Sequence, residues 1–190
     1  SSIPDWNYLV TWYAELAQAK AQSTYEIKEK VQELMPNPGA LTDAEKIKTI
    51  YDYITENIRY SSVSFRQSGL IPQKARDVLV NKIGDCKDVS TLGIAMLREV
   101  GIKAHYVLVN SGDEERFGNI PPSIEFNHCI VAVDNGTPTP LFLDLTANNH
   151  PVGSIPTMDR DAFSLVIKPG NTTPITLPRV QSAAPNMRST

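Results

Sequence analysis

Apolar side chains recur every three or four positions through the first 58 residues, which is the period of an α-helix. The sequences at 23–26 and 42–45 both read Ser/Thr-x-x-Glu. This pattern is typical of helix starts, because the two side chains can cap free N–H groups there. Pro36 and Gly39 interrupt the periodicity. We therefore predict three helices in this part, beginning near residues 6, 23 and 42.

Two more helices are predicted after a polar segment at 60–72, which is typical of a loop. The first is short and begins near Ala75. A turn at 81–85 separates it from the most apolar helix of the chain, which begins at Cys86. Gly101 stands where the residue after a helix end is expected, and it closes this helix.

After residue 102 the apolar period changes to two, which predicts strands. Asp134–Pro138 is typical of a hairpin turn. Helices followed by strands indicate the α+β class, with helices packed on one side of a small antiparallel sheet. The tail from Pro169 is rich in Pro, Ser and Thr, so we expect it to be loosely attached. The predicted strands lie at 103–109, 126–133, 141–145 and 163–167.

Composition narrows the classes of partner. With 190 residues, of which 41% are hydrophobic and 21% charged, the chain fits one soluble domain with an appended helical segment. Its net charge of −3 does not suggest a nucleic acid or an anionic membrane as partner. No apolar run is long enough to span a bilayer. The N-terminus has no initiator Met and no signal peptide, so we expect a processed or excised fragment whose ends do not reveal its compartment.

Two cysteines and three histidines are the remaining candidates for chemistry. Cys86 and Cys129 are too few for a disulfide framework, and we predict no bridge between them. The histidines show none of the spacings of a catalytic zinc site. We therefore predict no metal and no other cofactor.

Cys86 is the candidate nucleophile. It follows a Gly-Asp turn and opens the apolar helix, where free N–H groups and the helix dipole favour a thiolate. Most lone cysteines are small buried hydrophobes, but Asp85, Lys87 and Asp88 flank this one. We therefore expect Cys86 to lie in a polar and exposed position. A histidine is still required to take its proton.

His128 and Asp144 are the candidates for this base and for the group that orients it. Strand alternation places Cys129 on the face opposite His128, in the core. If the hairpin pairs symmetrically about Gly136, Asp144 lies directly opposite His128 and shares its face. A carboxylate in an apolar strand also requires a partner. We therefore predict a Cys86-His128-Asp144 triad.

Four stretches of this sequence resemble transglutaminase-like cysteine enzymes. Gly84-Asp85-Cys86-Lys87-Asp88 resembles the start of their nucleophile helix. Phe126-Asn127-His128 and Leu143-Asp144 look like their histidine and aspartate strands. Ile58-Arg59-Tyr60, followed by Pro72 and Ala75, is similar to the segment that precedes the nucleophile. The resemblance covers roughly residues 42–146.

This resemblance implies a papain-like fold, with the nucleophile at the N-terminus of a central helix and acyl transfer on a peptide or protein amide. It divides the chain into an N-terminal helical segment (1–41), a catalytic core (42–168) and a loosely ordered tail (169–190). It also implies flanking β-rich domains in a larger bacterial protein of the periplasm or cell envelope. We expect a monomer.

Acyl transfer also needs donors for the oxyanion. The backbone N–H of Cys86 is one, and Tyr60, Gln67 and Gln73 are candidates for the second. Papain-like proteases keep a glutamine six residues before the nucleophile, but that position is Val80 here. The second donor therefore stays open.

Three functions fit these residues. The favoured one is a cysteine hydrolase that breaks amide or peptide bonds through a thioester acyl-enzyme. The second is a transglutaminase, which transfers a glutamine acyl group to a lysine amine. The third is a non-catalytic binding or scaffold module of an envelope protein. The same triad serves the first two, so the sequence leaves the acceptor, water or an amine, open.

Overall fold

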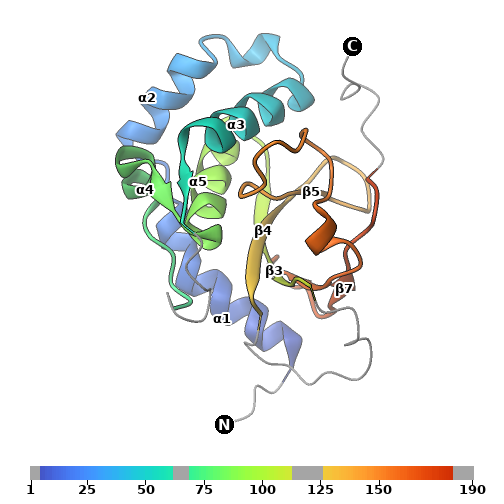
Figure 1. The fold of residues 1–190 in the computed structure, drawn as a ribbon. Helices are drawn as coiled ribbons and strands as arrows, with labels where there is room; N and C mark the ends of the chain where they lie inside the picture. The colour runs from blue at the N-terminus through green and yellow to red at the C-terminus, as the bar shows by residue number, and fades with distance from the viewer. Residues whose placement is uncertain (1–4, 62–68, 113–125, 182–190) are drawn as a thin grey trace.

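The computed structural model of this chain describes residues 5–61, 69–112 and 126–181. Helices lie on one side of a curled antiparallel sheet, and loops cover its other side (Figure 1). The predicted mixture of helices and an antiparallel sheet is confirmed. The α-helices are α1 (Trp6–Gln18), α2 (Tyr25–Leu34), α3 (Asp43–Asn57), α4 (Ala75–Asn81) and α5 (Cys86–Glu99). Short 3₁₀-helices are η1 (Ala19–Ala21), η2 (Pro38–Ala40) and η3 (Thr157–Asp159).

The main sheet has the strand order β5-β4-β3-β6-β7, and every neighbouring pair in it is antiparallel. A separate parallel pair joins β1 to β2 and brings Tyr60 opposite Gly84. Sequence reasoning predicted a loop and a turn there, because strands of two residues are too short to show a period. The strands are β1 (Arg59–Tyr60), β2 (Ile83–Gly84), β3 (Ala104–Asn110), β4 (His128–Val133), β5 (Leu141–Leu143), β6 (Phe163–Val166) and β7 (Ile175–Thr176).

The two predicted capping boxes have different outcomes. At the start of α3 the Thr42 hydroxyl accepts the N–H of Glu45, and the Glu45 carboxylate accepts the N–H of Thr42, so this box is confirmed. The box at Ser23 is wrong. The residue that precedes α2 is Thr24, whose side chain makes no capping hydrogen bond, and the Ser23 hydroxyl donates to Glu99 instead (2.5 Å).

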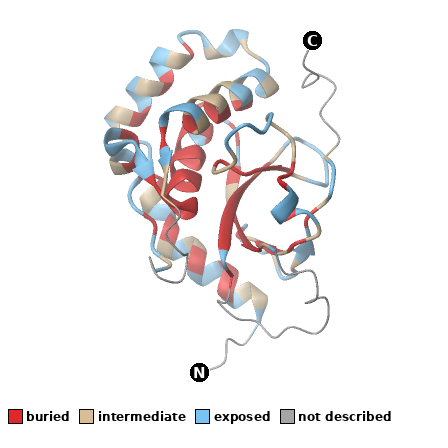
Figure 2. Cartoon of the chain, viewed as in Figure 1, coloured by how far each residue is buried: buried red, intermediate tan, exposed pale blue. Residues whose placement is uncertain are grey.

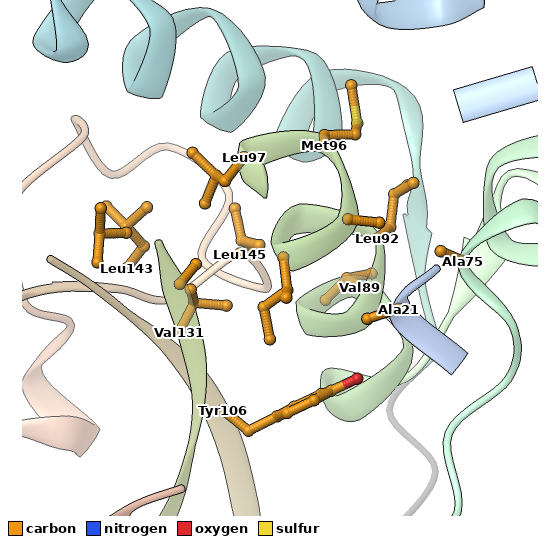
Figure 3. Close-up of a cluster of buried hydrophobic side chains, with 14 of the residues drawn as sticks. Ala21, Ala75, Val89, Leu92, Met96, Leu97, Tyr106, Val131, Leu143 and Leu145 are labelled. Carbon is orange, nitrogen blue, oxygen red and sulfur yellow. The ribbon is translucent and has the colours of Figure 1, made fainter. Parts of the chain in front are cut away.

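Helix α5 is the centre of the molecule. Every residue from Cys86 to Leu97 is buried, as expected for a helix that is enclosed on all sides (Figure 2). Its apolar side chains pack between the other helices and the sheet, and this cluster includes residues from α1 to β6. Figure 3 shows Leu92 and Met96 of α5 in the cluster with Val131 and Leu145.

Gly93 allows α5 to approach the segment that follows β5. A Cβ atom added at Gly93 would lie 2.4 Å from Cδ1 of Leu145, which is closer than any packed methyl group. Leu145 is itself 3% exposed and immediately follows Asp144. The close packing of helix and segment therefore fixes the backbone beside Asp144.

The first helix is anchored beside the start of β4. The Trp6 ring lies 6.3 Å from the ring of Phe126 and 5.6 Å from that of Phe163, measured between centroids. Phe126 precedes His128 by two residues, so these aromatic contacts tie α1 to the segment that leads into β4.

The segment after Pro169 is attached as far as Gln181, in contrast to the predicted loose tail. Ile175 and Thr176 pair with β6, and Leu177 is completely buried in a second apolar cluster on the far face of the sheet. The Gln181 amide exchanges two hydrogen bonds with the backbone of Phe142, at 2.6 and 2.8 Å. Sequence reasoning missed these contacts because Pro, Ser and Thr give no periodic apolar signal.

No helix in the described ranges is long and apolar enough to cross a membrane.

Candidate active site

Cys86 is the first residue of α5, as the sequence predicts, but it lies in a different environment from the expected one. The side chain of the preceding residue, Asp85, accepts the N–H of Asp88 and so caps the helix, and the Asp88 side chain accepts the N–H of Asp85. Cys86 is 2% exposed, so the expectation of an exposed position is wrong. The charged residues beside Cys86 do not bring it to the surface, because they form hydrogen bonds and an ion pair inside the protein.

A buried charge network surrounds this helix start. Lys87 is 2% exposed and forms an ion pair with the Asp85 carboxylate. Asp88 accepts hydrogen bonds from the backbone N–H of Gln73 (2.8 Å) and from its side-chain amide (3.0 Å). Buried charges are tolerated when they are paired and hydrogen-bonded in this way. The network therefore fixes the backbone on both sides of Cys86.

His128 and Asp144 lie in hydrogen-bonding contact. Nε2 of His128 is 2.9 Å from Oδ2 of Asp144, and both residues are almost completely buried. The backbone N–H and the hydroxyl of Thr146 donate to the other carboxylate oxygen, at 2.9 and 2.6 Å. The carboxylate is thus held in one orientation by donors on both sides.

The hairpin register that predicted this contact is wrong by two residues. Val131 pairs with Leu143 and Val133 with Leu141, so pairing is symmetric about residue 137 rather than Gly136. Asp144 is therefore a diagonal neighbour of His128, not its direct partner. Because the shift is even, the two side chains still share a face of the sheet. The imidazole and the carboxylate then reach each other across the diagonal.

The charges of this pair stabilise each other. Burial lowers the pKa of His128, but its contacts with Asp144 and Cys86 outweigh burial and raise that pKa well above its usual value. Burial raises the pKa of Asp144, but the hydrogen bond from His128 holds it well below its usual value. The pair therefore favours an imidazolium beside a carboxylate, with Nε2–H donating to Asp144.

Cys86 interacts with the same imidazole. The proximity of Cys86 helps Asp144 to raise the pKa of His128 against the effect of burial. Since Nε2 is engaged by Asp144, the Nδ1 side of the ring is left for the thiol. Cys86 begins α5, His128 begins β4 and Asp144 directly follows β5, so the three residues come from separate elements of the fold.

The three candidates for a second oxyanion donor differ in placement. Tyr60 pairs with Gly84, two residues before Cys86, and burial and Cys86 raise the pKa of its hydroxyl to about 12. Gln73 lies beside the helix start, but both its backbone N–H and its amide donate to Asp88. Gln67 lies outside the described residues. Among the described candidates, Tyr60 retains a donor for a ligand.

Asp159 is the polar residue of this region that sequence reasoning missed. It ends the short helix η3 and is 0% exposed, with Oδ1 at 3.9 Å from Nε2 of His128. Its segment lies between the predicted strands at 141–145 and 163–167, where the sequence predicts no helix or strand. No period or motif marks an aspartate that enters a site from such a loop.

A metal ion is a poor explanation for these three groups. His128, Asp144 and Asp159 each offer an atom within 4.8 Å of the others. However, a direct hydrogen bond accounts for the 2.9 Å separation of Nε2 of His128 and Oδ2 of Asp144, so this contact needs no ion to explain it. We therefore assign no metal ligand here.

A cavity of about 270 Å³ opens beside the start of α5. Its lining includes Ser61, Ile71, Gln73, Gly84, Asp85 and Lys87. The two residues on either side of Cys86 thus border a cavity that is large enough to hold part of a peptide side chain.

The sequence profile described as the transglutaminase-like superfamily matches residues 28–136. No functionally curated protein matches the sequence. A proposed protease from Parabacteroides distasonis has a TM-score of 0.68 and 16% sequence identity, and the alignment covers 94% of this chain and 32% of that protein. A proposed cysteine protease from Cytophaga hutchinsonii is 24% identical over 63% of this chain and 37% of its own, with a TM-score of 0.44. The first likeness shows the fold alone, and this chain spans about a third of the length of the two proteins.

Proposed function

We propose that this chain, which belongs to the transglutaminase-like superfamily, is a cysteine enzyme that breaks amide bonds of peptides or proteins through a thioester intermediate. The observation that supports this most directly is the position of His128, which interacts with Cys86 and with the Asp144 carboxylate. An imidazole held in this way can take the proton of a thiol and later return it to a leaving group.

The proposed reaction begins with the Cys86 thiolate and the His128 imidazolium. The thiolate attacks the amide carbonyl carbon, and His128 donates its proton to the leaving amine as the C–N bond breaks. The acyl group then remains on Sγ as a thioester. Neutral His128 takes a proton from the acceptor, whose oxygen or nitrogen attacks the thioester and releases Cys86. Asp144 stays ionised throughout and orients the imidazole.

Two donors are proposed for the negative charge that develops on the carbonyl oxygen. The backbone N–H of Cys86 belongs to the first turn of α5, where N–H groups have no partner within the helix. The Tyr60 hydroxyl is the second. With a pKa raised by burial to about 12, it stays protonated at any ordinary assay pH.

We keep water as the proposed acceptor, in line with the sequence analysis. An amine is the alternative, and one observation favours it: Cys86 is only 2% exposed, and exclusion of water protects a thioester from hydrolysis. The same triad serves both acceptors, so only the product distinguishes them.

Brief treatment with iodoacetamide at about pH 6, followed by intact-mass spectrometry, tests the activated thiol. We expect one adduct that forms at least about tenfold faster than the glutathione adduct, because the alkylating species is the thiolate. Cys86→Ala should abolish this adduct, and Cys129→Ala is the matched control that should keep it. A rate no higher than that of glutathione would contradict the proposal.

Incubation with glutamine-containing peptides, with and without a fluorescent amine, then identifies the acceptor. Cleavage or ammonia release that needs Cys86 supports hydrolysis, and covalent incorporation of the amine supports transfer. Peptide binding that survives Cys86→Ala, without turnover by the unaltered protein, would instead indicate a binding module.

A further inference from the structure

Asp159 is a completely buried carboxyl group without a hydrogen-bond donor. In the part of the chain that the structure describes, neither Oδ1 nor Oδ2 receives a hydrogen bond, although both atoms are inaccessible to solvent. A buried carboxylate in this position would be both desolvated and unpaired, which is strongly unfavourable. The environment of Asp159 therefore disfavours its ionised form.

The Asp144 carboxylate next to it has room for one more donor. A carboxylate offers about four acceptor positions. His128 uses one of them, and the backbone N–H and hydroxyl of Thr146 use two. Asp159 lies within 4.8 Å of this group, atom to atom. A proton on Asp159 would fill the remaining position and give Asp159 a partner at the same time.

We propose that Asp159 is a neutral carboxylic acid that donates a hydrogen bond to the Asp144 carboxylate and so holds Asp144 toward His128. This inference rests on the proposed function, since it adds a positioning residue to the Cys86-His128-Asp144 site. Asp159 does not touch the reacting atoms. It acts through Asp144.

The electrostatics of the cluster agree with this assignment. Burial and the neighbouring Asp144 raise the pKa of Asp159 to about 8, whereas the pKa of Asp144 lies well below its usual value. When the pKa values of two adjacent carboxyl groups are this far apart, the pair holds a single proton over a wide pH range. The reason is that two negative charges at short range repel each other.

The other titratable groups around the cluster come from four elements. His128 of β4 stabilises an ionised Asp159 through its positive charge, but burial and the neighbouring Asp144 outweigh this effect. Tyr51 of α3 and Tyr60 of β1 face Asp144 and are neutral near pH 7, because burial raises the pKa of each to about 12. Cys86 of α5 faces His128. Asp144 is thus the acceptor for the proton of Asp159.

Infrared difference spectroscopy between the unaltered protein and Asp159→Asn reads the protonation state without any substrate. At about pH 6.5 we expect the C=O band of a protonated carboxyl group in the unaltered protein alone, and it should shift in D₂O. The band should disappear as the pH rises through about 8. Absence of the band would overturn the proposal, whether or not the protein is active.

Kinetics with two variants that keep the branched shape of the Asp side chain then test whether a hydrogen-bond donor at this position is needed. Asp159→Asn keeps an N–H donor, so kcat/KM near pH 6.5 should stay within about threefold. Asp159→Leu has no donor, and it should lower kcat about ten- to a hundredfold with little change in KM. Asp161→Asn, on a partly exposed residue paired with Arg179, is the control and should change neither.

Equal activity of the Leu and Asn variants would overturn the positioning role. If Asp159→Leu does not fold, loss of the step in kcat/KM above about pH 8 in Asp159→Asn still tests it, because Asn cannot ionise. Retention of that step would contradict the proposal. An unreactive Cys86 in the unaltered protein would refute the proposed function instead, and the infrared band would still report on Asp159.

Discussion

Nε2 of His128 lies 2.9 Å from Oδ2 of Asp144, and Thr146 holds the opposite oxygen of the same carboxylate. This relationship fixes which imidazole nitrogen carries a hydrogen toward the carboxylate, because an ionised carboxylate only accepts. The other nitrogen is then free to exchange a proton with the Cys86 thiol. The reactivity of a buried cysteine is thus linked to a carboxylate that does not need to contact it.

Replacement of Asp144 by Asn tests this link. Asp144 raises the pKa of His128, so its loss should lower that pKa and remove the imidazolium at a lower pH. Cys86 should then lose the positive charge beside it near neutral pH. We expect iodoacetamide to label Cys86 at least about tenfold more slowly at pH 6–7, with recovery as the pH rises. An unchanged rate–pH profile would show that Asp144 does not act on the thiol.

Replacement of Tyr60 by Phe separates oxyanion binding from activation of the thiol. If the Tyr60 hydroxyl stabilises the oxyanion, its removal should lower kcat about a hundred- to a thousandfold. Labelling of Cys86 by iodoacetamide forms no oxyanion and should continue at the original rate. Tyr25→Phe, on a residue that is 75% exposed, is the control and should leave both rates unchanged. A parallel loss of turnover and labelling would point to a structural role for Tyr60.

The parts that sequence reasoning predicted well are those with long periodic signals. The five α-helices, four strands of the main sheet and the position of Cys86 at a helix start all follow from apolar spacing and turn residues. The contact of His128 with Asp144 was reached through a wrong register, and it survived because an error of two residues preserves the face of a strand. An error of one residue would have separated the pair.

The parts that sequence reasoning missed depend on contacts between distant short segments. The pairing of Tyr60 with Gly84 involves only two residues on each side, so neither segment carries a period of its own. Asp159 enters the site from an irregular loop, and its significance comes from burial beside Asp144. Both features depend on tertiary packing, which one-dimensional patterns do not record.

Gly84 offers a test of how the helix start is held. A Cβ atom added there would lie 2.6 Å from Cβ of Asp88, whose carboxylate caps α5 and binds Gln73. Because neither Cβ atom can rotate away, Gly84→Ala should displace the first turn of α5 and destabilise the protein by about 1–3 kcal/mol. Urea unfolding should show this loss. Labelling of Cys86 should also slow under conditions where the variant is still folded.

Gly39→Ala is the matched control for that substitution. Its added Cβ would meet nothing closer than Oδ1 of Asn37 at 3.9 Å, and its backbone does not require glycine. It should change stability by less than about 0.5 kcal/mol. If the two variants unfold at the same urea concentration, the close contact at Gly84 is relieved by local adjustment and does not support the helix start.

The pH dependence of stability should expose the proton on Asp159. An unfolded aspartate loses its proton near pH 3.9, whereas the pKa of Asp159 in the folded protein is about 8. Between these values only the folded state binds this proton, so the contribution of Asp159 to stability falls as pH rises and levels off above about 8. Asp159→Asn cannot ionise and removes this slope. Between pH 5 and 8, the free energy of unfolding of Asp159→Asn, measured with urea, should therefore rise relative to that of the unaltered protein by a few kcal/mol.

Two controls apply to this comparison. The contribution of His128, which is lost as pH rises, is present in both proteins and cancels in the difference. Asp161→Asn should show the same pH dependence as the unaltered protein. Parallel curves for the unaltered protein and Asp159→Asn would show that Asp159 is already ionised at pH 5.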